Sequence, residues 1–314
     1  LPVMKEILKD RSFKISILLT LVFLGVGIGF YILGLTELNW FLFLLLPVLL
    51  GLAIGALPNR NWALVGAIMA AIAFLVGLFT VGVAGFICIV YAIPIIVPFI
   101  FLGSVITHLV NRYKAIKTDK LSALFLPLLA FIIGAPVEHH WFESNPSIVE
   151  VRTERIFSNT PEQVYDAIKS VDTLDADKPF LMYLDLPVPT KCILEQEAIG
   201  GIRTCYFKGG NLSRLNYGGG VIVERITALE RGKILKMDVI DYTLVGRDWL
   251  GFKEAIYYFE KAGEGGCKLT RVTTYTSETT PRFYWEPLEK HGIRQEHDYV
   301  FNNLAKDLEN KYGR

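Results

Sequence analysis

The feature that most constrains this chain is an abrupt change of character near Pro136. Before this point long apolar stretches run almost without charge, and after it the sequence is polar and strand-patterned. A helix needs about 20 residues to cross a hydrocarbon layer about 30 Å thick. Several of the N-terminal stretches reach that length, so the sequence predicts a membrane-embedded helical part joined to a folded domain in water.

The apolar part divides into five predicted spans, at residues 13–35, 38–57, 62–81, 84–110 and 121–136. Residues 62–110 are too long for one crossing, because a single helix of that length would exceed about 70 Å. A turn at Gly82–Gly85 separates them. The fifth stretch is the shortest, so an interfacial or re-entrant helix is the alternative there.

Loop charges orient this helical bundle, because basic loops stay on the cytoplasmic side. The basic residues precede the first span or lie in the second and fourth loops: Lys5, Lys9, Arg11, Lys14, Arg60, Arg112, Lys114, Lys117 and Lys120. The other loops carry none. With five spans the N-terminus is cytoplasmic and the C-terminal domain is extracytoplasmic, as expected for an integral protein of a bacterial inner membrane. If the fifth segment did not cross, the domain would be cytoplasmic.

The helical part shows little chemistry of its own. His108 is the only ionisable residue well inside an apolar stretch, and helix packing explains it more simply than ion transport. At the junction His140 and Glu143 could share a helical face, but the neighbouring Trp141 and Phe142 fit a membrane-interface belt, so no metal site is predicted. Residues 141–314 carry 23 basic and 26 acidic residues, a balance that does not favour nucleic-acid binding. An anchoring role is therefore expected.

The sequence after Asn145 alternates with period two, as strands do. Thr160, Pro161 and Gln163 form a helix-start signal with a capping box. The pattern predicts a strand at 148–157, a short helix, six further strands and a helix at 286–311. The six strands are placed at 190–197, 202–208, 219–229, 233–241, 253–261 and 267–277.

This order is the helix-grip layout, an α+β fold in which a curved antiparallel sheet of about seven strands wraps a long C-terminal helix. The stretches 200–207 (GGIRTCYF) and 223–227 (VERIT), followed by Tyr284-Trp285 and His297, sharpen the match. The segment 145–312 resembles the START-like (SRPBCC) superfamily of polyketide cyclase/dehydrase and lipid transport type. The expected domains are a transmembrane bundle at 1–137, a linker at 138–146 and a START-like domain at 147–314.

The resemblance implies a pocket between sheet and helix, apolar with a few orienting polar groups. Aromatic candidates for its lining are Tyr183, Tyr206, Tyr242, Trp249, Tyr257, Tyr275, Phe283, Trp285 and Phe301, with core packing as the alternative for each. Arg203 and Glu224 lie on different predicted strands, where they pair with each other or orient a ligand, with exposed strand charges as the alternative. The expected ligand-binding set is Arg203, Tyr206, Glu224, Tyr242, Trp249, Tyr257, Trp285 and His297.

No catalytic triad, phosphate loop or metal cluster stands out, so the sequence predicts no cofactor and no assigned catalytic residue. His297 could act as an acid or base, but it has no visible partner. Cys192 and Cys205 are predicted to lie opposite each other in a hairpin turning near Ala198–Gly201. Two free buried thiols are favoured there, with a disulfide as the alternative.

The leading functional hypothesis is a membrane-anchored binding domain, carrier or sensor, for a hydrophobic, lipid-like molecule. A cyclase/dehydrase-type enzyme acting on a hydrophobic substrate is the second hypothesis. It would need His297, Glu224 and Arg203 to converge. The third is a structural or sensory subunit that binds a membrane protein partner, which an exposed apolar patch would favour.

Overall fold

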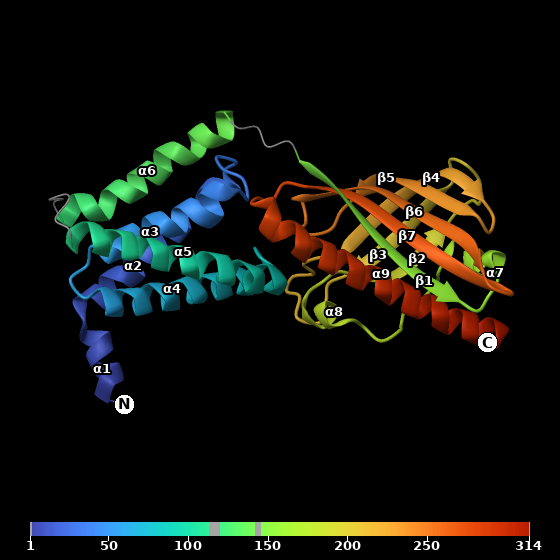
Figure 1. Ribbon diagram of the computed structural model, residues 1–314, viewed down its shortest axis with the longest axis horizontal. Helices are drawn as coiled ribbons and strands as arrows, with labels where there is room; N and C mark the ends of the chain where they lie inside the picture. The colour runs from blue at the N-terminus through green and yellow to red at the C-terminus, as the bar shows by residue number, and fades with distance from the viewer. Residues whose placement is uncertain (1, 113–119, 142–145, 314) are drawn as a thin grey trace. The chain divides into compact units, whose positions relative to one another are not determined.

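The computed structural model describes residues 2–112, 120–141 and 146–313 of the chain (Figure 1). It contains two compact units. One comprises Leu1–Ala84, Cys88–Asn145 and Glu278–Arg282, and the other comprises Gly85–Ile87, Pro146–Ser277 and Phe283–Arg314. Lys114 and Lys117 of the predicted basic loop, and residues 142–145 of the predicted linker, lie outside the described residues.

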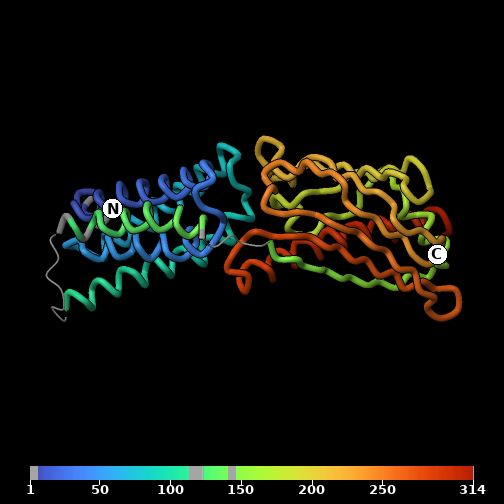
Figure 2. The backbone as a smooth tube through the Cα atoms, turned by 90° about the horizontal axis from the view of Figure 1, so that it is seen from above, coloured from blue at the N-terminus to red at the C-terminus, as the bar shows by residue number. Residues whose placement is uncertain are grey.

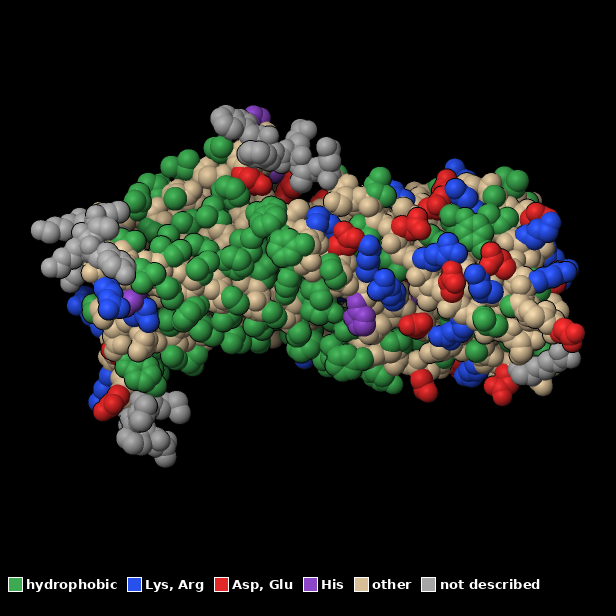
Figure 3. Space-filling model, in the orientation of Figure 1, with side chains coloured by type: hydrophobic (Ala, Val, Ile, Leu, Met, Phe, Trp, Pro, Cys, Tyr) green, Lys and Arg blue, Asp and Glu red, His purple; other side chains and the backbone are tan. Residues whose placement is uncertain are grey.

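The first unit is helical. Its elements are α1 (Pro2–Lys9), α2 (Arg11–Ile32), a π-helical turn (Phe41–Leu45) that continues into α3 (Leu46–Gly55), α4 (Arg60–Thr80), α5 (Phe86–Arg112) and α6 (Lys120–Trp141). Three of the described helices, α2, α4 and α5, are long and apolar enough to cross a membrane. Figure 3 shows hydrophobic side chains covering most of the visible face of the helical unit.

The prediction of five full spans is met only in part. The apolar helices Phe41–Gly55 and Leu124–His140 are shorter than the other three. The first of them starts late because the Asn39 side chain accepts hydrogen bonds from the backbone N–H groups of Phe41 and Leu42. Its length of about 22 Å is less than a hydrocarbon layer of about 30 Å. The helix α6 also continues through Pro136, where the sequence predicted its end, to Trp141.

Small residues allow α3 and α5 to approach at the backbone. A Cβ added to Gly51 would collide with the carbonyl oxygen of Ile100, and one added to Gly103 would collide with the carbonyl oxygen of Val48. Glycine at such crossings is typical of helices in membranes, where close backbone packing replaces the hydrophobic effect as the associating force. The apolar composition therefore makes the helices, while these two glycines decide how two of them pack.

The second unit contains a seven-stranded antiparallel sheet with the order β1-β7-β6-β5-β4-β3-β2. The strands are β1 (Ser147–Phe157), β2 (Val188–Leu194), β3 (Ile202–Lys208), β4 (Gly220–Glu230), β5 (Ile234–Tyr242), β6 (Leu250–Ala262) and β7 (Gly266–Ser277). Two short helices, α7 (Pro161–Ile168) and α8 (Phe180–Leu184), join β1 to β2, and α9 (Arg282–Tyr312) ends the chain. The sheet is curved (Figures 1 and 2). The predicted strands and long helix are present, whereas α8 was not predicted.

Local signals explain why the elements begin where they do. Thr160 and Gln163 form the predicted capping box at the start of α7, with Pro161 in its first turn. The helix α9 buries Phe301, Leu304 and Leu308 against the sheet and α7. The Phe301 ring meets Phe157 of β1 edge to face, with 6.1 Å between ring centroids. The core of this unit therefore lies between α9 and one face of the sheet.

Candidate functional site

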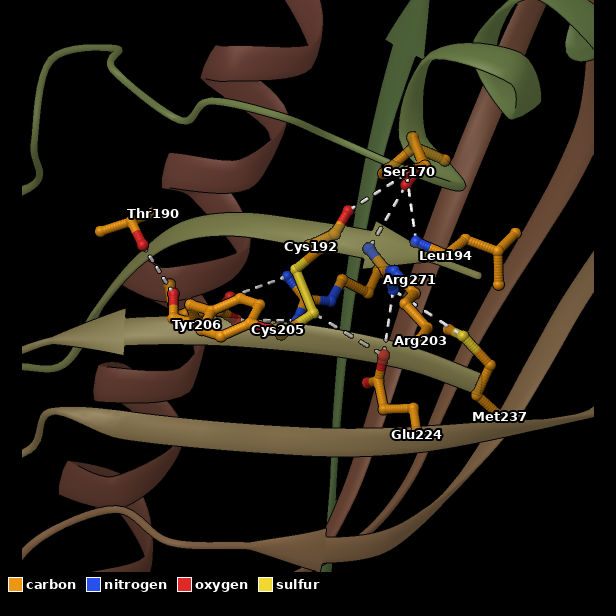
Figure 4. Close-up of a disulfide and its surroundings, with 12 residues drawn as sticks. Ser170, Thr190, Cys192, Leu194, Arg203, Cys205, Tyr206, Glu224, Met237 and Arg271 are labelled. Atoms are coloured by element: carbon orange, nitrogen blue, oxygen red, sulfur yellow. Dashed lines mark hydrogen bonds and ion pairs between the residues drawn. A yellow bond between two sulfur atoms is a disulfide. The ribbon is translucent and has the colours of Figure 1, made fainter. Parts of the chain in front are cut away.

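The interior between the sheet and α9 contains ion pairs as well as apolar side chains. Arg203 of β3 and Glu224 of β4 are directly opposite each other in the sheet. Arg203 Nη1 donates to Glu224 Oε2 at 3.2 Å, and both side chains are buried. Figure 4 shows this pair beside Met237 and the Cys192–Cys205 bridge. Arg203 Nη2 also donates to the carbonyl oxygen of Ile168, the last residue of α7.

A second interior pair connects β7 to α9. Arg271 contacts both carboxylate oxygens of Glu296, with Nη1–Oε1 at 3.2 Å and Nη2–Oε2 at 2.9 Å. This two-pronged geometry is the strong form of an arginine–carboxylate contact. The Tyr257 ring of β6 contacts both arginines, with its centroid 5.8 Å from Cζ of Arg203 and 5.5 Å from Cζ of Arg271. The two ion pairs and Tyr257 therefore form one cluster, called the arginine cluster below.

One donor on each arginine of this cluster has no partner. The Nε atoms of Arg203 and Arg271 are both buried, and neither makes a hydrogen bond with any described residue. An unsatisfied buried donor costs about 1–3 kcal/mol, so native interiors usually supply it with water or a ligand. The two Nε atoms are therefore donors that an oxygen acceptor, such as a hydroxyl, carbonyl or carboxylate, would satisfy.

Burial and pairing act in opposite directions on the ionisation of this cluster. Burial is the largest single influence on Arg203 and disfavours its charged form, but Glu224 and Tyr257 together outweigh it, so the pKa of Arg203 is raised. Glu296, Tyr257 and Glu224 together do the same for the pKa of Arg271. Burial raises the pKa of Glu296, and Arg271 only partly offsets that shift. Both arginines therefore remain charged, and Glu296 is the acid whose protonation is made easier.

His297 of α9 is completely buried and is held by two threonines. Its Nε2 lies 2.8 Å from Thr273 Oγ1 of β7, and its Nδ1 lies 2.9 Å from Thr153 Oγ1 of β1. Burial, reinforced by Arg271 and Arg294, lowers the pKa of His297 well below its usual value. The imidazole is thus neutral and fastens α9 to two strands. No acid contacts its ring nitrogens in the described part of the chain.

The aromatic residues of the predicted binding set fall in different places. Tyr257 belongs to the arginine cluster. Tyr242 donates to the carbonyl oxygen of Leu250 at 2.6 Å, and Trp249 is partly buried in the neighbouring packing cluster. Trp285 is buried near the start of α9.

Tyr206 does not lie with the other members of this set. On β3 the buried positions are those of Arg203 and Cys205, so Tyr206 has the opposite phase and is 38% exposed. Its ring stacks under Lys191 Nζ, 4.5 Å from the ring centroid. Of the predicted binding set, Arg203, Glu224 and Tyr257 lie together in the arginine cluster. His297 follows Glu296, another member of that cluster, in the sequence.

Sequence reasoning missed Arg271 and Glu296. Both carry a detectable signal, because each is a charged residue at an inward-facing position. Arg271 has the same strand phase as the buried Leu269 and Tyr275 of β7, and Glu296 falls between Ile293 and Val300 at helical spacing. A charged residue whose spacing matches the inward-facing apolar residues of a strand or helix is a candidate for a buried ion pair or a binding group.

Cys192 and Cys205 form a disulfide between β2 and β3, which corrects the expectation of two free thiols. The two residues are directly opposite in the sheet register, as the hairpin predicted. Cys205 Sγ lies 3.8 Å from Glu224 Oε2. The bridge therefore fastens the edge strand β2 next to the arginine cluster. Within the described residues, no group of three or more His, Cys, Asp or Glu could hold a metal ion.

No protein-family model matches the chain, and no curated protein matches it by sequence. Solved structures do resemble part of it. A START superfamily protein from Mycobacterium smegmatis has a TM-score of 0.38 at 10% identity, covering 51% of this chain and 97% of that one. A putative uncharacterized protein from Rhizobium leguminosarum has a TM-score of 0.37 at 15% identity, covering 53% and 98%.

A protein from Chromobacterium violaceum has a TM-score of 0.34 at 17% identity, covering 50% of this chain and 94% of that one. Likeness at these scores carries no argument about ligand or activity. The neighbours thus include a START superfamily protein, while the fold of the second unit is established by its own strand order and by α9.

Proposed function

We propose that this chain is a membrane-anchored binding protein for a hydrophobic, lipid-like molecule that carries one polar group. The observation that carries the proposal is the pair of buried Nε atoms of Arg203 and Arg271, which have no hydrogen-bond partner among the described residues and belong to the same unit as a core of aliphatic and aromatic side chains. An oxygen of the ligand would accept from these donors. Its apolar body would replace water along the inner face of the sheet.

The helical unit supplies the membrane anchor in this proposal. Three helices long and apolar enough to cross a membrane support it, and we propose that the two shorter apolar helices complete five crossings. The loop charges then place the N-terminus in the cytoplasm and the START-like domain, residues 147–314, on the outer face of a bacterial inner membrane. The Cys192–Cys205 disulfide supports this placement, because disulfides persist in oxidising compartments.

An enzymatic role has less support from the site. A general acid–base mechanism would use His297, whose two ring nitrogens are both occupied by threonine hydroxyls. Glu224 is held by Arg203, and Glu296 by Arg271. The charged groups are thus paired with one another, an arrangement that favours positioning a ligand over proton transfer.

The test is to purify the full-length protein in mild detergent and to analyse it by native mass spectrometry and lipid extraction. A bound apolar molecule with an oxygen-containing polar group is expected. Arg271→Lys keeps the charge but removes the guanidinium Nε, so it should lower the amount of co-purified ligand several-fold. The matched control is Arg155→Lys, which alters an arginine paired with Asp298 near the surface and should change nothing. Protein that carries no such molecule would contradict the proposal.

A further inference from the structure

The two ends of the sheet differ in the character of their loops. At one end, which we call the linker end, β1 begins, and the register aligns Ser147 of β1 with Ser277 of β7 and with Leu250 of β6. Because the strands are antiparallel, this end also carries α8 and the loops 209–219 and 243–249. At the opposite end the β4–β5 and β6–β7 turns consist of glycine and charged residues: Arg231, Gly232, Lys233, Gly263, Glu264 and Gly265.

Backbone hydrogen bonds join the three segments of the linker end into one surface. Leu212 N–H donates to the carbonyl of Leu184 at 2.6 Å, which fastens loop 209–219 to α8. Gly218 N–H donates to the carbonyl of Val245 at 2.8 Å, which fastens the same loop to loop 243–249. The segments therefore present their side chains together.

Large apolar side chains of these segments are exposed. The exposed fractions are 68% for Phe180, 49% for Tyr183, 44% for Leu212, 77% for Leu215 and 47% for Val245. Leu215 is further distinguished by its backbone, which has φ of 49°. A bulky residue in this left-handed region is strained, whereas glycine would adopt it freely. The turn thus holds a leucine outward at a position where folding alone favours a glycine.

Two lysines lie beside these side chains. Lys178 Nζ donates to Asn211 Oδ1 at 2.8 Å, and neither Lys178 nor Lys208 forms an ion pair within the described part of the chain. Burial and the nearby charge of Lys208 lower the pKa of Lys178. The two lysine charges repel each other, and a nearby anionic surface would offset that repulsion. Asp177 and Asp248 are also exposed at this end, so the electrostatic part of the attraction is modest.

The covalent chain connects this end of the sheet to the helical unit. Ser147 follows Trp141, the last residue of the apolar helix α6, by only six residues. Six residues span at most about 21 Å when fully extended. The linker end is therefore the end of the sheet that is tied to the apolar helix α6.

We propose that the linker end docks on the surface of the lipid bilayer, with Phe180, Tyr183, Leu212, Leu215 and Val245 inserted at the headgroup boundary and with Lys178 and Lys208 facing anionic headgroups. Apolar side chains flanked by lysines are the composition that partitions into this boundary. The inference rests on the membrane anchorage of the proposed function but not on its ligand. Docking and ligand binding can therefore fail separately.

The experiment uses the full-length protein in lipid nanodiscs, in a Cys88→Ala, Cys267→Ala background that keeps the Cys192–Cys205 bridge. Single cysteines are introduced as Leu215→Cys and Val245→Cys, and an environment-sensitive fluorophore is attached to each. The matched control is Ile199→Cys, which is 73% exposed, close to the 77% of Leu215, but lies in the β2–β3 loop at the opposite end. Near-ultraviolet circular dichroism confirms that each labelled protein is folded.

Brominated phosphatidylcholine should quench the labels at positions 215 and 245 several-fold more than the label at position 199. In nanodiscs that contain phosphatidylglycerol, Lys178→Glu combined with Lys208→Glu should reduce the quenching toward the level seen without anionic lipid. Equal quenching at all three positions would overturn the proposal. A blue shift at positions 215 and 245 without quenching would also overturn it, because a protein surface would then cover these residues.

Discussion

Arg203 of β3 and Glu224 of β4 face each other across adjacent strands, joined by a 3.2 Å contact and withdrawn from water. Two opposite charges in such a place depend on each other, because either one alone would be a buried uncompensated charge.

Removing one member of this pair should be far more harmful than removing both. Glu224→Leu alone is expected to lower the free energy of unfolding by about 3–5 kcal/mol, because it leaves the Arg203 charge buried without its partner. Adding Arg203→Met should recover most of that loss. Urea unfolding followed by tryptophan fluorescence measures the free energy of unfolding of the single and the double variant.

The matched control for this pair is Lys233→Met, which breaks an exposed pair with Glu230 and should cost less than about 1 kcal/mol. A double variant that is no more stable than Glu224→Leu would show that the two charges are not coupled.

His297 predicts a pH dependence of stability. Its pKa is well below 6.5 in the folded state and near 6.5 in the unfolded chain, so the unfolded state binds the extra proton first. The stability contributed by the neutral imidazole is fully present above pH 6.5 and is lost as the pH falls below it. The free energy of unfolding should fall by up to about 1.4 kcal/mol per pH unit between pH 6.5 and 5.

The variant His297→Gln isolates this contribution, because glutamine does not titrate and can still hydrogen-bond to a threonine. It should be less stable at pH 7.5 and should lose less stability on acidification than the unchanged protein. Parallel pH curves for the two proteins would mean that His297 is not the group responsible.

The Cys192–Cys205 bridge should stabilise the sheet unit. It closes a loop with a sequence separation of 13 residues, for which loss of chain entropy in the unfolded state predicts about 3 kcal/mol. Cys192→Ser with Cys205→Ser, or a membrane-permeant reductant, should therefore lower the urea midpoint. Reductant should have no further effect on the double variant, and a midpoint unchanged in both cases would contradict the prediction.

Two glycine-to-alanine substitutions in the helical unit should have different effects on its stability. Gly51→Ala should destabilise it, because the new methyl group meets the backbone of α5 at Ile100. Gly25→Ala, on a helix surface with nothing within 4 Å, should be neutral or stabilising because alanine favours helix more than glycine does. The temperature at which each variant aggregates in detergent measures its stability relative to the unchanged protein. Equal behaviour would show that α3 and α5 do not pack through Gly51.

Much of this architecture is predictable because its signals are local. The capping box of Thr160 and Gln163 acts within one helical turn, and period-two alternation places the seven strands to within a few residues. The five-residue helix α8 carries no comparable signal. The predicted span at 38–57 is too long because hydropathy does not register the Asn39 side chain that delays the helix start.

The candidate site is less predictable because it depends on contacts between distant residues. Cys192 and Cys205 could be placed opposite each other from the hairpin length, yet only the folded geometry decides for a bond over two thiols. Arg271 and Glu296 lie on a strand and on α9, and nothing in their spacing along the chain pairs them.

Hydrophobic periodicity and turn residues act over short distances, so the apolar helices, the meander of strands and the long final helix could be predicted from the sequence. The pairing of β1 with β7, the contacts of Arg203 and Arg271 with Tyr257, and the outward position of Tyr206 emerged from the folded structure alone. Pairing partners and burial depend on the closing of the whole sheet around α9, a long-range outcome that no single stretch of the chain encodes.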